Sequence, residues 1–356
     1  MILFLQNNYI IIWLGQTLVR FFSLFYSKTP EIQDSSGRVK PDSIASLEKV
    51  EIGGIKQFIL IRGHNTDNPL LLMLHGGPGS AEMALAHRFD TELEKHFIVV
   101  NWDQRGAGKS FSKKVPKESM NVEQFISDTH ELVLMLKKRF NKEKIYLVGH
   151  SWGSQLGSLV VHRFPEHFYA YIGIGQVVNL HKNEEISYQY VLNEAKKREN
   201  KKGIKALEAI QPYTGTEYKK LRIQRKWLNK FGGVMKAYKS QLAFLRLGLS
   251  APEYSLRDFI KFIRGLLFSI KSGIWPELFK YNLDEIIKEY KVPIYFFVGK
   301  YDYNTPFELS EEFFKKVSAP KKEYIWFENS AHMPNCEENQ KYTELLITKV
   351  LPETRK

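Results

Sequence analysis

A short stretch near the middle of the chain has the residue types and spacing of nucleophilic catalysis. Residues 149–153 read G-H-S-W-G, which places Ser151 between two glycines. Large and β-branched apolar side chains precede this turn over residues 145–148, and apolar residues return after it with helical spacing. The pattern predicts a buried strand, a sharp turn and a helix. A serine on such a turn presents its hydroxyl at the sheet edge, where it can attack a carbonyl carbon.

A serine hydroxyl needs a base to take its proton, and the base needs a partner that fixes its tautomer. Where a nucleophile follows a strand in this way, the acid and then the histidine come later along the chain. Asp302 lies three residues beyond Gly299, in VGKYDYNTP, and His332 lies in ENSAHMPN, just after the last predicted strand. We therefore predict Ser151, Asp302 and His332 as the catalytic residues.

The residues around Asp302 and the other histidines support this assignment. Asn304 or Thr305, just before Pro306, is expected to cap the next helix, which leaves Asp302 free to orient the histidine. His75 and His150 flank the glycine-rich motifs at positions better suited to structural hydrogen bonds.

Acyl transfer also requires donors for the oxyanion that forms on the substrate carbonyl. The backbone N–H of Trp152, the residue after the nucleophile, is one expected donor. The second is expected in the glycine loop HGGPGS at residues 75–80, with Gly77 as first choice and Gly76 as the alternative. Loss of one such donor typically lowers the rate about a hundredfold to a thousandfold.

Hydrophobic patterning locates the elements that must position these residues. Helical spacing is found at residues 82–95, at 122–140 and after Ser151. Strands are predicted at residues 49–52, 56–61, 70–74, 97–102, 144–148, 169–174, 293–299 and 323–327. Strands that alternate with helices in this way predict an α/β fold with a mostly parallel sheet and right-handed crossovers.

A basic and aromatic segment separates the two halves of this pattern. Residues 179–290 are mostly helical by period and are predicted to form a helical cap over the catalytic edge. The chain is thus divided into a hydrophobic segment (1–26), a polar linker (27–46), the first part of the core (47–178), the cap (179–290) and the second part of the core (291–356).

Composition narrows the class of protein and of partner. The single cysteine, Cys336, excludes a disulfide framework and a cysteine-rich metal site, and we predict neither a metal nor a cofactor. The net charge is +13, and residues 182–280 hold 21 Lys and Arg against 9 Asp and Glu. This charge indicates either a solvated helical surface or attraction of the cap to an anionic surface such as cytoplasmic lipid headgroups. No nucleic-acid partner is expected, since no binding motif accompanies the charge.

The first 26 residues contain one formally charged side chain, Arg20, and have about the length that a membrane-spanning helix needs. No basic leader or small-residue cleavage site marks them as a signal peptide. We expect an uncleaved membrane anchor or an interfacial helix, with the enzyme body at the cytoplasmic face; the alternative is a cytoplasmic protein on which this helix packs. The sequence predicts no particular oligomeric state.

Three motifs together resemble one family. HGGPGS at residues 75–80, WDQRGAGKS at 102–110 and GHSWGS at 149–154, with the spacing to Asp302 and His332, are similar to the proline iminopeptidase branch of the α/β-hydrolase superfamily. The resemblance extends over residues 47–351. It implies an α/β-hydrolase fold and a serine aminopeptidase that releases N-terminal proline or small residues from short peptides. The alternative is an esterase, lipase or thioesterase that acts on acyl esters.

The resemblance also implies roles for further residues. In this family, cap glutamates bind the free ammonium of the substrate, so Glu184 and Glu185 are the first candidates here, followed by Glu194, Glu208 and Glu217. The WDQRG segment is a structural turn in the family, in which we expect Asp103 to pair with Arg105. His150 stands where the family commonly has glycine, and Ala331 stands where glycine is frequent before the histidine.

Overall fold

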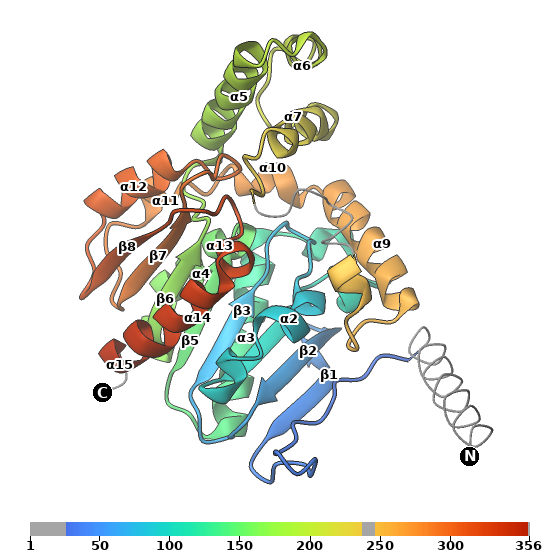
Figure 1. Cartoon of the computed structure of the whole chain (residues 1–356), viewed down its shortest axis with the longest axis vertical. Helices are drawn as coiled ribbons and strands as arrows, with labels where there is room; N and C mark the ends of the chain where they lie inside the picture. Colours follow the sequence, from blue (N-terminus) through green and yellow to red (C-terminus); the bar gives the residue numbers. More distant parts are fainter. Residues whose placement is uncertain (1–25, 237–245, 355–356) are drawn as a thin grey trace, which may run out of the picture.

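The computed structural model describes residues 26–236 and 246–354. An eight-stranded sheet in the order β1-β2-β4-β3-β5-β6-β7-β8 runs through its centre (Figure 1). The strands are β1 (Ile44–Ile52), β2 (Ile55–Gly63), β3 (Leu70–Leu74), β4 (Ile98–Asp103), β5 (Ile145–His150), β6 (Phe168–Ile174), β7 (Ile294–Gly299) and β8 (Lys322–Phe327). The pairs β1–β2 and β2–β4 are antiparallel, and the other neighbours are parallel. The predicted mostly parallel sheet is therefore confirmed, with β1 beginning earlier than expected.

The central strands are buried on both faces. Leu70 and Leu72 belong to one hydrophobic cluster, whereas Leu71, between them, belongs to the cluster on the opposite face. This alternation follows from the two-residue period of a strand. Full burial of one such side chain contributes about 1.5–3 kcal/mol, so both clusters stabilise the sheet.

Helices cover each face of the sheet (Figure 1). One cluster contains side chains of α3 (Val122–Phe140), α4 (Trp152–Arg163) and α12 (Phe307–Lys316), and the other contains side chains of α14 (Asn339–Leu345) and η6 (Leu346–Val350). Helix α3 has the predicted bounds, and its N-cap Asn121 accepts a hydrogen bond from the backbone N–H of Gln124. The shorter elements are η3 (Gly108–Ser110), η4 (Lys117–Ser119), η5 (Pro165–His167), α13 (Pro334–Glu337) and α15 (Leu351–Thr354).

The helix predicted at residues 82–95 is wrong as a continuous element. The segment forms only η1 (Met83–Leu85), α2 (Ala86–Phe89) and η2 (Leu93–Lys95). The first helical part ends where the buried carboxylate of Asp90 accepts a hydrogen bond from Asn101 of β4 at 2.8 Å. Helical spacing in the sequence therefore reflects burial of Met83, Phe89 and Leu93 by separate short turns.

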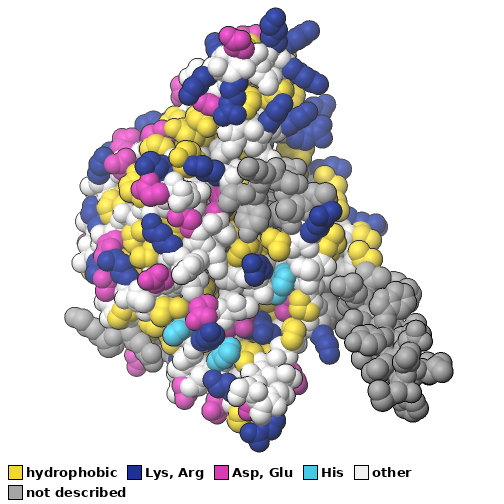
Figure 2. Space-filling model, in the orientation of Figure 1, with side chains coloured by type: hydrophobic (Ala, Val, Ile, Leu, Met, Phe, Trp, Pro, Cys, Tyr) yellow, Lys and Arg dark blue, Asp and Glu magenta, His cyan; other side chains and the backbone are white. Residues whose placement is uncertain are grey.

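The chain between β6 and β7 forms the predicted helical cap over the carboxyl edge of the parallel strands (Figure 1). Its helices are α5 (Leu180–Lys197), α6 (Lys201–Glu208), α7 (Tyr218–Lys230), α9 (Leu256–Ser272), α10 (Ile274–Leu278) and α11 (Leu283–Ile286). The first three share a separate hydrophobic core that includes Val191, Leu207 and Trp227. Figure 2 shows Lys and Arg side chains gathered at their outer end.

The expected membrane anchor or interfacial helix at residues 1–26 lies, except for Tyr26, outside the described residues. Within the described ranges, every helix falls short of the length and apolar character needed to cross a bilayer. The linker meets the cap near the start of α9, since the backbone N–H of Lys28 donates to the carbonyl of Pro252 at 3.0 Å.

Candidate active site

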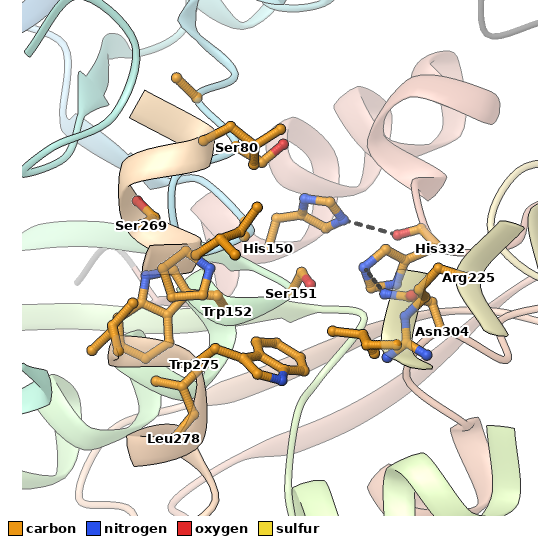
Figure 3. Close-up of a pocket in the computed structure, with 18 of the residues that line it drawn as sticks. Ser80, His150, Ser151, Trp152, Arg225, Ser269, Trp275, Leu278, Asn304 and His332 are labelled. Carbon is orange, nitrogen blue, oxygen red and sulfur yellow. Dashed lines mark hydrogen bonds between the residues drawn. The ribbon is translucent and has the colours of Figure 1, made fainter. Parts of the chain in front are cut away.

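The three predicted catalytic residues follow three parallel strands. Ser151 follows β5, Asp302 follows β7 and His332 follows β8, and the carboxyl ends of these strands lie at one edge of the sheet. Ser151 and His332 line the same cavity of about 940 Å³ (Figure 3). Asp302 lies behind the imidazole and is 1% exposed. The fold thus brings all three residues together.

Ser151 occupies a strained turn between strand and helix. Its backbone angles are φ 55° and ψ −120°, a region that residues with a Cβ atom rarely adopt. The backbone N–H of Ser151 donates to the carbonyl of Ile174 at 2.9 Å. A Cβ atom at Gly149 would lie 2.2 Å from the carbonyl oxygen of Gly153, and one at Gly153 would lie 2.1 Å from the carbonyl oxygen of Leu74. Both glycines of the motif are therefore required by close backbone approach.

A hydrogen bond of 2.9 Å joins His332 Nδ1 to Asp302 Oδ2. The other carboxylate oxygen of Asp302 accepts from the backbone N–H groups of Asn304 and Thr305, each at 2.9 Å. Because the carboxylate can only accept, it holds the imidazole as the Nδ1–H tautomer and leaves Nε2 with a lone pair. This is the arrangement that a general base needs.

Asn304 has a position that the sequence did not predict. Its side-chain Nδ2 donates to His332 Nε2 at 2.9 Å (Figure 3). The expected capping by Asn304 or Thr305 is wrong, since α12 begins at Phe307 after Pro306 and no side chain caps it. Asp302 itself takes the two backbone N–H groups, so one carboxylate orders both the turn and the histidine.

The glycine loop after β3 lies against the serine. A Cβ atom at Gly76 would lie 3.1 Å from Ser151 Cβ, but the Gly76 N–H already donates to Glu82 Oε1 at 3.1 Å. Gly77 has φ +117°, and a Cβ atom there would lie 2.6 Å from the backbone nitrogens of Gly79 and Ser80. Trp152 is the first residue of α4, so its N–H has no partner within the helix. Of the three predicted donors, Gly76 therefore already has an acceptor for its N–H, whereas the N–H of Trp152 has none within its own helix.

The WDQRG turn is held by contacts other than the one expected. Arg105 pairs with Asp128 of α3 through two bonds of 2.9 Å, so the predicted pairing of Arg105 with Asp103 is wrong. Asp103 instead accepts from the backbone N–H of Lys109 at 2.7 Å and from the hydroxyl of Tyr254. Burial raises the pKa of Asp103 to about 6, although both of these hydrogen bonds lower it.

Of the two first-choice cap glutamates, Glu184 lines the cavity and Glu185 does not. Glu184 is 1% exposed, pairs with Arg225, and accepts from the hydroxyl of Tyr213 at 2.6 Å. Glu185 is exposed, so the structure does not bring it to the site. Helical phase is the signal that separates them, because Glu184 lies four and seven residues before the buried Tyr188 and Val191.

The other cap glutamates lie away from the cavity, where Glu194 pairs with Arg198 and Glu217 with Lys220, and Glu208 is exposed. Apolar side chains supply much of the cavity wall, among them Leu85, Val177, Leu180, Phe262, Leu266 and Trp275. Among residues 26–236 and 246–354, no group of three or more His, Cys, Asp or Glu side chains is arranged to hold a metal ion.

Comparison with known proteins agrees with this fold. The family model described as the alpha/beta hydrolase fold matches residues 69–338. A probable aminopeptidase of Bacillus subtilis (strain 168) is 38% identical over 312 residues, which cover 85% of this chain and 96% of that protein. A proline iminopeptidase of Heyndrickxia coagulans is 22% identical over 293 residues, which cover 78% of this chain and 88% of that protein.

Among solved structures, the proline iminopeptidase-related protein from Thermus thermophilus superposes with a TM-score of 0.62 at 20% identity. The match covers 87% of this chain and 98% of that chain. Identity at this level establishes the shared fold.

The backbone strain at residue 151 predicts a difference between two inactive variants. Ser151→Gly is expected to exceed Ser151→Ala in free energy of unfolding by about 1 kcal/mol, because glycine adopts the observed backbone angles without a Cβ clash. Both variants lack the hydroxyl, so urea denaturation of the pair isolates the backbone effect. If Ser151→Gly were instead less stable than Ser151→Ala by about 0.5–1 kcal/mol, the usual entropic cost of glycine, the turn would hold no strain.

Proposed function

Because this chain belongs to the α/β-hydrolase family, we propose that it is a serine hydrolase with Ser151 as nucleophile and His332 as base. Asp302 orients the base. The observation that carries the proposal is the 2.9 Å bond between His332 Nδ1 and Asp302 Oδ2, beside a serine on a strained turn in the same cavity. Nucleophile, base and orienting acid are the minimum set for acyl-enzyme chemistry.

The chemical steps follow from this arrangement. His332 Nε2 takes the proton of the Ser151 hydroxyl as Oγ attacks the substrate carbonyl carbon. The N–H groups of Gly77 and Trp152 donate to the oxyanion. The carbon–nitrogen bond breaks as His332 returns the proton to the departing amine, which leaves an ester on Ser151. Water, deprotonated by His332, then attacks that ester and releases the acid.

We propose an aminopeptidase that releases N-terminal proline or small residues from short peptides. Two observations support this substrate class: the relatives of the chain are named as aminopeptidase and proline iminopeptidases, and the cap places Glu184 in the cavity wall. A carboxylate there can accept hydrogen bonds from a substrate ammonium. Arg225 compensates part of its charge, so the pair as a whole is close to neutral.

The alternative is an esterase, lipase or thioesterase that uses the same three residues. The apolar wall of the cavity favours this reading, because acyl chains need no charged partner. The two candidates differ in whether a free amine on the substrate matters.

We also propose that the protein attaches peripherally to an anionic lipid surface at the cytoplasmic face of a membrane. Leu256, Ile260, Ile263 and Leu267 form an exposed stripe on α9, each with 44–57% of its surface accessible. The exposed basic residues Arg257, Arg264 and Lys271 lie beside the stripe. Apolar and basic side chains on adjacent faces of one helix suit the headgroup region of an anionic bilayer.

The position of the linker also supports the proposal that α9 faces the lipid surface. The hydrogen bond from the backbone N–H of Lys28 to the carbonyl of Pro252 places this part of the linker close to the start of α9, where the stripe begins. The cap as a whole is also positively charged, like the basic residues beside the stripe.

A panel of substrates tests the reaction. The protein is expected to cleave prolyl or alanyl anilides with a free amine at least tenfold faster than their N-acetylated forms, because the Glu184 carboxylate in the cavity wall would accept hydrogen bonds from the ammonium. It is also expected to react with a fluorophosphonate probe, and Ser151→Ala is expected to abolish both activities. Turnover of nitrophenyl esters alone would replace the aminopeptidase with the esterase reading, and labelling that persists in Ser151→Ala would exclude this nucleophile.

Substitution of the cavity glutamate tests how the amine is bound. Glu184→Gln is expected to raise KM for free-amine anilides about tenfold to a hundredfold, because it removes a charged acceptor and leaves Arg225 to repel the ammonium. Steady-state kinetics on the anilides and on nitrophenyl esters measure the effect, with the exposed Glu185→Gln as matched control. An equal loss on both substrate types would count against ammonium binding.

Vesicle sedimentation tests the lipid surface. The full chain is expected to bind vesicles of phosphatidylcholine and phosphatidylserine more tightly than phosphatidylcholine alone, and high salt is expected to weaken the binding. Ile260→Asn with Ile263→Asn should lower the affinity at least tenfold, because two apolar side chains no longer enter the interface. Leu134→Asn, at an equally exposed position on α3, is the control. Unchanged binding in the double variant would refute a role for α9.

A further inference from the structure

His150, the residue before the nucleophile, has hydrogen-bond acceptors at both ring nitrogens. Its Nδ1 lies 2.7 Å from Glu82 Oε1, and its Nε2 lies 3.0 Å from the main-chain oxygen of His332 (Figure 3). An ionised carboxylate and a carbonyl can only accept, so with Glu82 ionised both ring nitrogens carry a proton. The ring is 5% exposed, and the raised pKa of His150 and the lowered pKa of Glu82 both favour a buried imidazolium and carboxylate.

This ion pair contacts three segments of the active site. Glu82 also accepts from the backbone N–H of Gly76, in the loop that carries the oxyanion donor Gly77. His150 is joined to Ser151 by the chain and to the loop of the base by the carbonyl of His332. A Cβ atom at Gly76 would lie 3.4 Å from both Glu82 Oε1 and His150 Nδ1, so the loop packs directly on the pair.

We propose that the Glu82–His150 ion pair positions the oxyanion loop and the histidine loop around Ser151. Neither residue touches the reacting atoms. Both are positioning residues, and the inference rests on the proposed role of Ser151 as nucleophile. His150 stands where the family commonly has glycine. Its ion pair with Glu82 holds the oxyanion donor Gly77 and the base His332 in fixed positions relative to each other.

The groups that face His150 make the pair sensitive to pH. Burial lowers the pKa of His150, but the facing Glu82 outweighs it, and the pKa lies above its ordinary value. Burial raises the pKa of Glu82, but His150 outweighs it, and the pKa is lowered. Asp302 also favours the imidazolium, and the His332 ring lies 4.8 Å away between centroids.

His75 is a further titratable group beside the pair, and the buried side chains of Asp90, Cys336 and Tyr342 also interact electrostatically with Glu82. Burial lowers the pKa of His75, and its Nε2 accepts from the backbone N–H of Gln104, so it stays neutral. Because the pKa of His150 is raised in the folded protein, its ring is charged and pairs with Glu82 at any pH below that pKa. The ring loses its charge, and with it the ion pair, as the pH rises through the pKa. Positioning of the two loops is therefore lost at alkaline pH, and removal of the Glu82 charge moves this loss to lower pH.

The rate of Ser151 labelling by a fluorophosphonate, measured across pH 6 to 10, tests the inference. Wild type is expected to show an alkaline fall, and Glu82→Gln is expected to move its midpoint down by at least one pH unit and to slow labelling up to about tenfold per unit of that shift at pH 9. His150→Gln is expected to remove that midpoint. Glu94→Gln is the matched control, because it removes a buried carboxylate that pairs with Arg62 and lies, like Glu82, between β3 and β4. This variant should keep the wild-type pH profile.

An unchanged midpoint in Glu82→Gln would overturn the positioning role, whereas failure of wild type to label at all would instead reject the serine nucleophile. The charge of His150 can also be measured without substituting either residue of the pair. In protein labelled with ¹⁵N-histidine, the His150 signals, assigned by their shift in Ser151→Ala, are expected to show both nitrogens protonated at pH 7.5. A neutral His150 would overturn the inference even if the variants at the pair fail to fold.

Discussion

The architecture of the site depends on the close approach of backbone at the turn between β5 and α4. The carbonyl of Leu74, at the end of β3, lies where a Cβ atom of residue 153 would stand, and the carbonyl of Ile174, at the end of β6, binds the N–H of Ser151. The strands β3 and β6 thus both contact the turn that follows β5. A larger side chain at Gly149 or Gly153 would separate them and move the hydroxyl away from the base.

Buried polar groups keep this edge from collapsing into an apolar core. Gln104 accepts from the indole N–H of Trp152 at 3.0 Å and donates to the carbonyl of His75 at 3.1 Å, while Arg105 is held by Asp128. Each of these groups would be costly to bury without a partner. The satisfied network therefore fixes the spacing between the glycine loop and the nucleophile helix, which hydrophobic packing alone does not determine.

The sequence predicts the sheet and the meeting of Ser151, Asp302 and His332 because both follow from local patterns: alternating strands and helices, and loops at carboxyl ends. Partner choice among buried polar side chains is different. Arg105 pairs with Asp128 because α3 packs beneath the turn, and Glu82 meets His150 from another segment of the chain. Such contacts depend on which residues are neighbours in three dimensions. Residues 82–95 form separate short turns, so the helical periodicity of this segment did not indicate where the Glu82 side chain would lie.

The hydrogen bond from Asn304 to His332 Nε2 gives the resting enzyme a particular property. The lone pair of His332 Nε2 accepts a hydrogen bond from an amide that belongs to the protein itself. In the proposed mechanism, this amide must turn aside before His332 can take the proton of the Ser151 hydroxyl. The backbone carbonyl of Asn304 also accepts from the side chain of Asn183 of α5, at 3.0 Å, so the residue that occupies Nε2 is anchored to the cap.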